Sequence, residues 1–200
     1  MMKLFYAKTS PYARVVLVMA KEKGLGDRVE VETVDPWTDP PALRAASPLG
    51  RVPVLVTDDG EGLPESPAIA RYLEAADDAV RLIPDGDAGW PVLRLAALAH
   101  GTIDAAFVAV MERRRPADRQ VPELADRRLA AIRRSVPVLA NARDWAGDPP
   151  FDYAGIAVAC LLDYLDFRLP ETGWRDGQPG LAAWFEAARQ RPSMRGTDPR

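Results

Sequence analysis

Residues 47–56 read Ser-Pro-Leu-Gly-Arg-Val-Pro-Val-Leu-Val, and residues 65–70 read Glu-Ser-Pro-Ala-Ile-Ala. The first run joins a turn at Gly50 to a Val-Pro step at the start of an apolar strand. The second run places a carboxylate and a hydroxyl where a helix opens. A glycine turn, a proline at a strand start and an acid-hydroxyl pair together predict a site that holds a small anionic peptide.

The residues around these two runs complete an α/β pattern. Residues 2–7 read as a short strand, and Ser10 then offers a helix N-cap with proline at the first helical position. That helix ends at Gly24. The elements that follow are a strand over 29–34, a short helix over 40–46, a strand over 52–57, a strand near Gly62, and a helix capped by Ser66 that runs to Ala76. This order is that of a thioredoxin-like fold.

The second half of the chain has only helical spacing. Residues 77–87 hold several acidic residues with Pro84 and Gly86, and are interpreted as a linker. Helices are expected over residues 88–115, 123–145, 152–169 and 180–189, because no segment there alternates with a period of two. We therefore expect a thioredoxin-like α/β domain over residues 1–76 and an all-α domain over residues 88–200.

Composition excludes several classes of function. The 26 basic and 29 acidic residues give a net charge of −3, which provides no electrostatic footprint for nucleic acid or an anionic membrane. One cysteine, Cys160, and one histidine, His100, are too few for Cys/His zinc clusters or disulfide frameworks, and Cys160 is expected to be a buried apolar side chain. With no apolar signal region and no run of about eighteen apolar residues, a cytoplasmic protein is predicted.

The Val52-Pro53 step has two interpretations. A proline at the start of a buried strand removes a ladder donor, so its placement needs a reason. If the bond is cis, the N–H and C=O of Val52 turn outward as a free strand edge that can pair with a bound peptide. The alternative is a trans proline that only begins the strand.

Glu65 and Ser66 also have two interpretations. The Ser66 hydroxyl and the first backbone N–H groups of its helix can bind a carboxylate, and Glu65 favours an ammonium group. These are the two charged groups of an amino-acid-like ligand end. The alternative is a plain capping serine beside a surface glutamate.

Ser10 lies at the positive end of the first helix, where a hydroxyl donor can stabilise a thiolate. Lowering a thiol pKa by one unit needs about 1.4 kcal/mol, which one charge-assisted hydrogen bond and a helix terminus together supply. A simple N-cap is the alternative, and Thr9 is a competing donor.

The run Ser10-Pro11-Tyr12-Ala13-Arg14, residues 47–56, Glu65-Ser66 and the Ile156-Ala157-Val158-Ala159-Cys160 segment together resemble a bacterial glutathione S-transferase. The resemblance implies that Ser10 hydrogen-bonds the sulfur of glutathione and that Val52, before a cis Pro53, pairs with the cysteinyl backbone. It also implies that Glu65 and Ser66 hold the γ-glutamyl end. Arg51 and Trp37 fall near the residues that contact the glycyl end.

The same resemblance implies an enzyme of detoxification, and a homodimer. The implied enzyme would deliver the glutathione thiolate to a small hydrophobic electrophile or peroxide, with glutathione as co-substrate and no tightly bound cofactor. Two alternatives are a transferase-like protein that binds or regulates without turnover, and a glutathione-dependent thiol reductase, which normally has cysteine at the place of Ser10. The sequence departs from the family at Gly155, where an aspartate often completes a reciprocal cap with the residue at Asp152.

A second substrate is expected against the helical half. His100, Asp104, Phe107 and Met111 recur at helical spacing on one face, so they are candidates to border a site at the domain junction. Phe107 and Met111 are also compatible with a core, and Asp104 with a ligand or subunit contact. Thr9, Tyr12 and Trp37 are further candidates for contact with the second substrate or a partner subunit.

Overall fold

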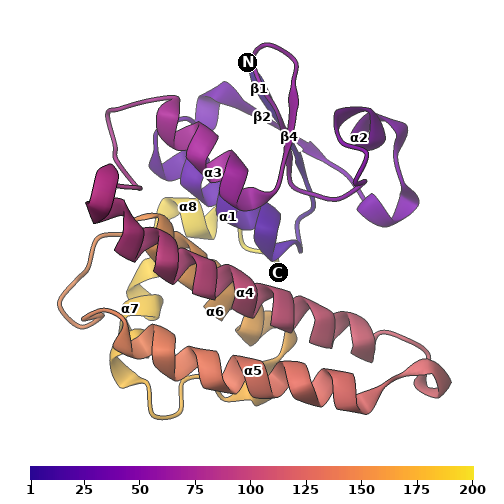
Figure 1. Ribbon diagram of the computed structural model, residues 1–200, viewed down its shortest axis with the longest axis vertical. Coiled ribbons are helices and arrows are strands. Elements are labelled where there is room, and N and C mark those ends of the chain that lie inside the picture. Colours follow the sequence, from indigo (N-terminus) through magenta and orange to yellow (C-terminus); the bar gives the residue numbers. More distant parts are fainter. The chain divides into compact units, whose positions relative to one another are not determined.

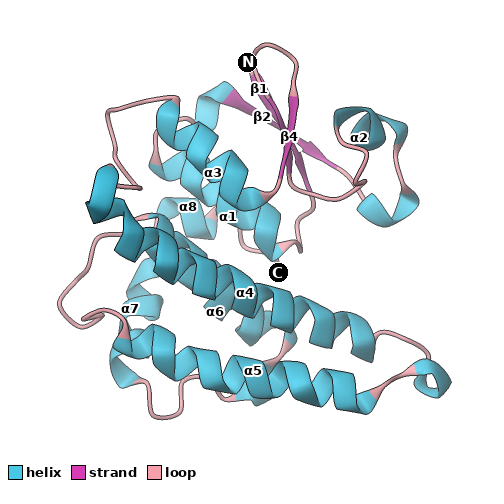
Figure 2. Cartoon of the chain, in the orientation of Figure 1, coloured by secondary structure: helices cyan, strands magenta, loops and turns pink.

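Four short strands form one mixed sheet in the order β2-β1-β3-β4 in the computed structural model, which describes residues 1–200 (Figure 2). The strands are β1 (Met2–Tyr6), β2 (Val29–Thr33), β3 (Val54–Val56) and β4 (Gly62–Pro64). β1 pairs in parallel with β2, whereas the β1–β3 and β3–β4 pairs are antiparallel. This is the connectivity that the sequence predicts, and it is thioredoxin-like.

Helices cover both faces of this sheet because side chains alternate along β1. Leu4 and Tyr6 point to the face packed by α1 (Pro11–Glu22) and α3 (Ser66–Ala75). Phe5 points the other way and packs with Leu43 of the short helix α2 (Pro41–Ala46). Figure 1 shows α2 on the opposite side of the sheet from α1 and α3. The 3₁₀ turns η1 (Gly26–Arg28) and η2 (Pro36–Thr38) flank β2.

The chain forms two units by its contacts: residues 1–85 with 191–200, and residues 86–190. The boundary after Asp85 lies inside the segment expected to be a linker. That segment is tied down, because the buried Lys23 Nζ donates to Glu74 Oε2 at 3.2 Å and to the Val80 carbonyl at 2.5 Å. The Glu74 carboxylate also accepts the Leu82 N–H at 3.1 Å.

The last ten residues belong to the first unit, which differs from the expectation of one helical domain over residues 88–200. α8 (Pro192–Arg195) and its flanks pack on α1. Arg14 is 3% exposed, and its guanidinium donates to Thr197 Oγ1 at 3.2 Å and to the Met194 carbonyl at 3.1 Å. A buried guanidinium needs such acceptors, and they come from the end of the chain.

The second unit is all helical, as the sequence predicts. Its elements are η3 (Gly86–Ala88), α4 (Gly89–Arg113), η4 (Ala117–Arg119), α5 (Pro122–Asn141), α6 (Tyr153–Arg168), η5 (Pro170–Thr172) and α7 (Pro179–Ala188). α5 ends at Asn141, before the expected Trp145, and the Trp145 indole N–H donates to the Leu139 carbonyl at 2.9 Å. The residues of α6 from Tyr153 to Leu165, including Cys160, are buried.

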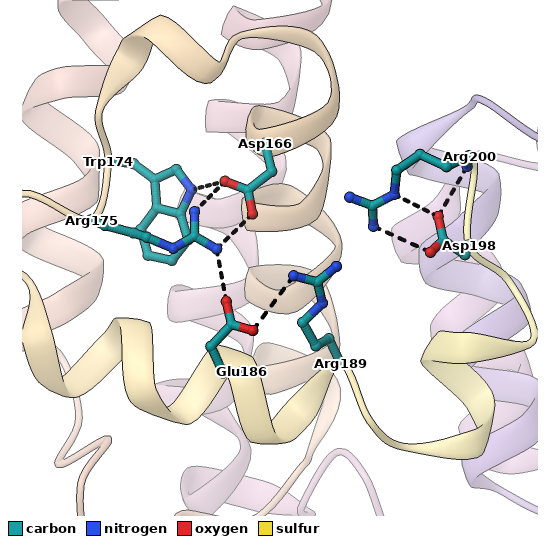
Figure 3. A network of polar contacts seen from close by, with 7 residues as sticks. All are labelled: Asp166, Trp174, Arg175, Glu186, Arg189, Asp198 and Arg200. Atoms are coloured by element: carbon teal, nitrogen blue, oxygen red, sulfur yellow. Dashed lines mark hydrogen bonds and ion pairs between the residues drawn. The ribbon is translucent and has the colours of Figure 1, made fainter.

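Polar contacts fasten the loop between α6 and α7 (Figure 3). Asp166 accepts from the Trp174 indole N–H at 2.7 Å and from two nitrogens of Arg175. The Arg175 guanidinium lies 4.3 Å from the centroid of the Trp174 ring and also pairs with Glu186 at 2.9 Å. Hydrogen bonding to Asp166 raises the pKa of Arg175 above its ordinary value, so this cluster stays charged.

The segment Gly86–Arg113, which contains α4, is long and apolar enough to span a bilayer by length and composition alone. It contains no unbroken run of about eighteen apolar residues, because Arg94, His100 and Asp104 interrupt it. More than half of its most apolar stretch is buried within the protein, and α4 packs against α5 and α6, which is the pattern of a core helix.

Candidate functional site

The three sequence pieces predicted to form the site meet at one edge of the sheet. Phe5 pairs with Val54 in the antiparallel β1–β3 ladder, and Val54 pairs with Pro64 in the antiparallel β3–β4 ladder. The end of β1, the start of β3 and the end of β4 therefore lie side by side. The loop to Ser10, the Val52-Pro53 step and the Glu65-Ser66 pair each continue from one of these strand ends.

Two helix N-termini also lie at this edge, because α1 follows β1 and α3 follows β4 directly. Their first backbone N–H groups carry the positive ends of two helix dipoles. A sheet edge with two such ends favours a ligand that carries negative charge.

Ser10 is the N-cap of α1, as predicted. Its Oγ accepts the backbone N–H of Ala13 at 3.2 Å, and the side chain is half-buried. Because the hydroxyl accepts through one lone pair, its own hydrogen remains available to a further acceptor. Thr9, the competing donor, is exposed in the turn before Ser10, and Tyr12 is half-buried on the first turn of α1.

The Val52-Pro53 peptide bond is cis. Val54 is the first residue of β3 in the ladder, so the Val52 main chain lies outside it. No backbone hydrogen bond of the surrounding loops involves the N–H or C=O of Val52. The free strand edge predicted at Val52 is therefore present, beside a buried Pro53.

The prediction that Ser66 is the N-cap of α3 is wrong by one residue. Glu65 is the N-cap, and Ser66 is the first helical residue. Glu65 adopts φ 69° and ψ 116°, a conformation that residues with a Cβ rarely adopt, and such strain concentrates at ligand-binding sites. No side chain caps α3, and the hydroxyl of Ser66 makes no hydrogen bond to the protein, so the start of this helix is open to a ligand.

Arg51 and Glu65 form an ion pair, with 2.9 Å between Nη2 and Oε1. Their side chains are 67% and 60% exposed, so the pair contributes little to stability and rearranges easily. Arg51 therefore lies beside Glu65, which is predicted to bind the γ-glutamyl end of the ligand. The positive Arg51 side chain and the negative Glu65 side chain lie next to each other.

Trp37 is 73% exposed although it is a large apolar side chain. It lies in η2, which follows the end of β2, and the Asp35 carboxylate accepts its backbone N–H at 3.0 Å. Because Thr33 of β2 pairs with Tyr6 of β1, Trp37 continues from the same sheet edge as Ser10. Asp35 was not singled out from the sequence, although an aspartate before Pro36 is a recognisable turn signal.

The second-substrate candidates predicted in the helical half of the chain lie on α4. Asp104 is exposed, whereas Phe107 and Met111 are half-buried. His100, at the start of the same stripe, has its Nε2 2.9 Å from the Tyr153 hydroxyl. Burial lowers the pKa of His100 to about 4, with opposition from Asp104, so the imidazole is neutral near pH 7.

Comparison with known proteins identifies the class to which this fold and site belong. Residues 9–76 match the model of the glutathione S-transferase N-terminal domain, and residues 122–187 match that of the glutathione S-transferase C-terminal domain. The chain belongs to the glutathione S-transferase family.

Individual relatives match along the whole chain. The uncharacterized GST-like protein YibF of Escherichia coli K12 is 35% identical over 201 residues, which is 99% of this chain and 98% of that protein. A glutathione transferase family member of Pseudomonas fluorescens Pf-5, solved with bound glutathione, is 40% identical with a TM-score of 0.93 and full coverage of both chains. A structure of a Pseudomonas fluorescens Pf-5 family member with S-(propanoic acid)-glutathione is 39% identical, with a TM-score of 0.88, covering 100% of this chain and 98% of that one.

Proposed function

We propose that this protein is a glutathione transferase, which binds glutathione at the edge of its sheet and delivers the thiolate to a small electrophile. The observation that carries the proposal is the open start of α3, with strained Glu65 and unpartnered Ser66 beside the unpaired main chain of Val52. The bound glutathione of the Pseudomonas fluorescens relative supports the choice of ligand.

Each part of glutathione has a complementary group. The γ-glutamyl carboxylate is held by the Ser66 hydroxyl and the α3 amides, and its ammonium by Glu65. The cysteinyl backbone pairs with the N–H and C=O of Val52 beside Pro53, in the manner of an added strand. Arg51 is proposed to reach the glycyl carboxylate, and Trp37 to lie near that end.

Ser10 is the proposed thiolate-stabilising residue. Its hydroxyl donates a hydrogen bond to the sulfur while its oxygen accepts from Ala13, so the hydroxyl is held in place and polarised. The α1 dipole adds to this effect. Together these interactions lower the thiol pKa by about one to two units, which raises the thiolate fraction at neutral pH. Thr9 is the alternative donor.

The proposed reaction is nucleophilic attack by sulfur. The thiolate forms a carbon–sulfur bond, and the substrate either loses a leaving group with its electron pair or, after addition to a double bond, takes up a proton at carbon. With a peroxide, the sulfur attacks one oxygen, the O–O bond breaks, and the other oxygen leaves with the electron pair and takes up a proton. The glutathione sulfenic acid formed in this way then condenses with a second glutathione to give the disulfide and water. A bound S-substituted glutathione in the second Pseudomonas fluorescens structure supports the conjugation reaction. Asp104, Phe107 and Met111 are proposed to border the electrophile or a subunit contact.

Family membership supports three broader proposals. The protein acts in detoxification, in the cytoplasm, and as a homodimer. Sedimentation velocity tests the dimer, for which a mass near twice 21.9 kDa is expected.

The thiolate absorbance of bound glutathione tests the proposed activity. In the wild type, the absorbance should rise at a lower pH than for free glutathione. Ser10→Ala should shift this midpoint upward by about one unit, while Thr9→Ala should leave it unchanged. Unchanged thiolate formation in Ser10→Ala would assign the role to another donor. A bound thiol with its ordinary pKa, and no turnover of electrophiles, would instead favour a binding or regulatory protein.

A further inference from the structure

The α8 segment, residues 191–200, lies alongside α1 and runs in the opposite direction within the first unit. At the last residue of α1, Glu22 Oε2 accepts from Arg191 Nη2 at 2.6 Å. In the turn before α1, Lys8 Nζ donates to the Arg200 carbonyl at 2.8 Å. The start of the segment therefore meets the end of the helix, and its last residue lies beside the turn that leads into the helix (Figure 1).

Arg14, on the first turn of α1 after its N-cap, contacts the middle of the α8 segment. Its Nε donates to Thr197 Oγ1 at 3.2 Å and its Nη2 donates to the Met194 carbonyl at 3.1 Å. The Thr197 hydroxyl in turn donates to the Ser193 carbonyl at 2.8 Å. Because a guanidinium is planar and its donors have fixed directions, two acceptors on different residues fix both the position and the orientation of the Arg14 side chain.

The end of the α8 segment also has a fixed local geometry. The Asp198 carboxylate accepts the backbone N–H of Arg200 at 2.9 Å and its side-chain Nε at 2.9 Å (Figure 3). These two hydrogen bonds hold residues 198–200 in one conformation, in which the Arg200 carbonyl accepts from Lys8. The exposed turn of Lys8 and Thr9 therefore has a contact with the α8 segment.

Ser10 lies between the two residues that contact this segment. Its backbone N–H donates to the Ala7 carbonyl at 2.9 Å, and its carbonyl accepts the backbone N–H of Arg14 at 3.1 Å. Its Oγ accepts the N–H of Ala13, the residue before Arg14. A displacement of Arg14 would therefore reach both the main chain and the hydroxyl of Ser10 through single hydrogen bonds.

Stability alone does not explain a buried guanidinium at this place. Burial of a charged group costs free energy, and apolar side chains of similar volume often give equal or greater stability. The pair of Glu22 and Arg191 already joins the α8 segment to the other end of α1. The buried arginine adds a fixed orientation, and it does so close to the end of α1 that Ser10 caps.

We propose that Arg14, held by Thr197 and Met194, is a positioning residue for Ser10. The α8 segment fixes Arg14, and Arg14 fixes the first turn of α1, so that the Ser10 hydroxyl is aimed at the glutathione sulfur before the ligand binds. This inference rests on the proposed function, in which Ser10 stabilises the thiolate. It goes beyond that function by giving the α8 segment a part in the hydrogen bond to sulfur, although the segment acts through Arg14.

The thiolate absorbance of bound glutathione, followed against pH, tests the proposal. Thr197→Val removes one acceptor of Arg14 at nearly constant volume, and Arg14→Lys keeps the positive charge but loses the two-pronged contact. Each should raise the midpoint by about half a pKa unit, which is half of the rise expected for Ser10→Ala. Thr197→Ser keeps the hydroxyl and should keep the wild-type midpoint. An equal rise in Thr197→Ser and Thr197→Val would contradict a role for this hydrogen bond.

A double variant separates positioning from a direct effect on the sulfur. If Arg14 acts only through Ser10, Thr197→Val should cause no further rise when Ser10→Ala is already present. The same rise in both backgrounds would show that the effect bypasses Ser10, and would overturn the inference.

Glu22→Gln is the matched control for loss of stability. It weakens the contact of the same segment with α1 at a distance of about 18 Å along the helix from Ser10. It should lower Tm in thermal melts and leave the thiolate midpoint unchanged. A rise as large as that of Thr197→Val would show that general loosening of the segment moves the midpoint, which would contradict a specific role for Arg14.

The same titrations distinguish the failure of this inference from that of the proposed function. If glutathione does not bind, or if Ser10→Ala leaves the midpoint unchanged, the proposed role of Ser10 fails and the inference fails with it. If Ser10→Ala raises the midpoint while Thr197→Val and Arg14→Lys keep the wild-type value, only the inference is overturned.

Discussion

The buried pair of Lys23 and Glu74 offers a sharp test of how the first unit is held together. Glu74→Ala removes the carboxylate from an ammonium whose side chain is 0% exposed, and it leaves the Leu82 N–H without its acceptor. Breaking a buried ion pair on one side costs about 3–5 kcal/mol. The Val80 carbonyl at 2.5 Å still accepts from Lys23, so we expect a loss of about 3–4 kcal/mol in the free energy of unfolding.

This loss corresponds to a fall of roughly 10 °C in Tm for a chain of this size. Urea unfolding followed by circular dichroism measures it, and hydrogen exchange at the Leu82 amide gives a local readout. Arg81→Ala is the matched control in the same segment, because its pairs with Asp78 and Asp85 are exposed, and it should change stability by less than about 1 kcal/mol.

The double variant Lys23→Met with Glu74→Leu should regain more than half of the loss, because no buried charge then remains unpaired. A cost below about 1 kcal/mol for Glu74→Ala, or a double variant as unstable as the sum of its parts, would refute the reasoning.

The other predictions concern single groups in both units. The only histidine, His100, should titrate near pH 4 by NMR. In the unfolded state the same imidazole takes up a proton near pH 6.5. The neutral, buried His100 therefore contributes up to about 3 kcal/mol to the free energy of unfolding above pH 6.5, and this contribution is lost as the pH falls from 6.5 toward 4. A His100→Asn variant should lack this part of the pH dependence, and a native midpoint near 6.5 would contradict the burial argument. Gly62→Ala places a Cβ against the carbonyl at the end of α2 and should cost at least about 2 kcal/mol, whereas Gly101→Ala on α4 meets open space and should be neutral or stabilising in thermal melts. Arg14→Ala should free residues 191–200 and make them more sensitive to limited proteolysis, with about 2–3 kcal/mol lost; unchanged cleavage would argue against the role of its hydrogen bonds to that segment.

Local signals in the sequence predicted most of the first unit. Ser10 before a proline at N1 located the start of α1 correctly. The Val52-Pro53 step left cis and trans bonds open, the family resemblance implied cis, and the bond is cis. The start of α3 was placed one residue late, because the sequence carries no signal for a glutamate with positive φ at residue 65. A positive φ is usually adopted by glycine, so a glutamate with positive φ is recognised only from the tertiary structure.

Local sequence signals did not predict contacts between residues that lie far apart along the chain. The side chains of Arg14 and Thr197 meet across 183 residues, so hydrophobic periodicity placed the last ten residues in the wrong unit.

Calorimetric titration with glutathione, and with the dipeptide cysteinylglycine that lacks the γ-glutamyl group, tests the central claim most directly. Glutathione should bind with a Kd at or below about 1 mM. Cysteinylglycine should bind at least about tenfold more weakly, because Glu65 and Ser66 then have no partner. No binding of glutathione at millimolar concentration, or equal affinity for the two peptides, would contradict the account.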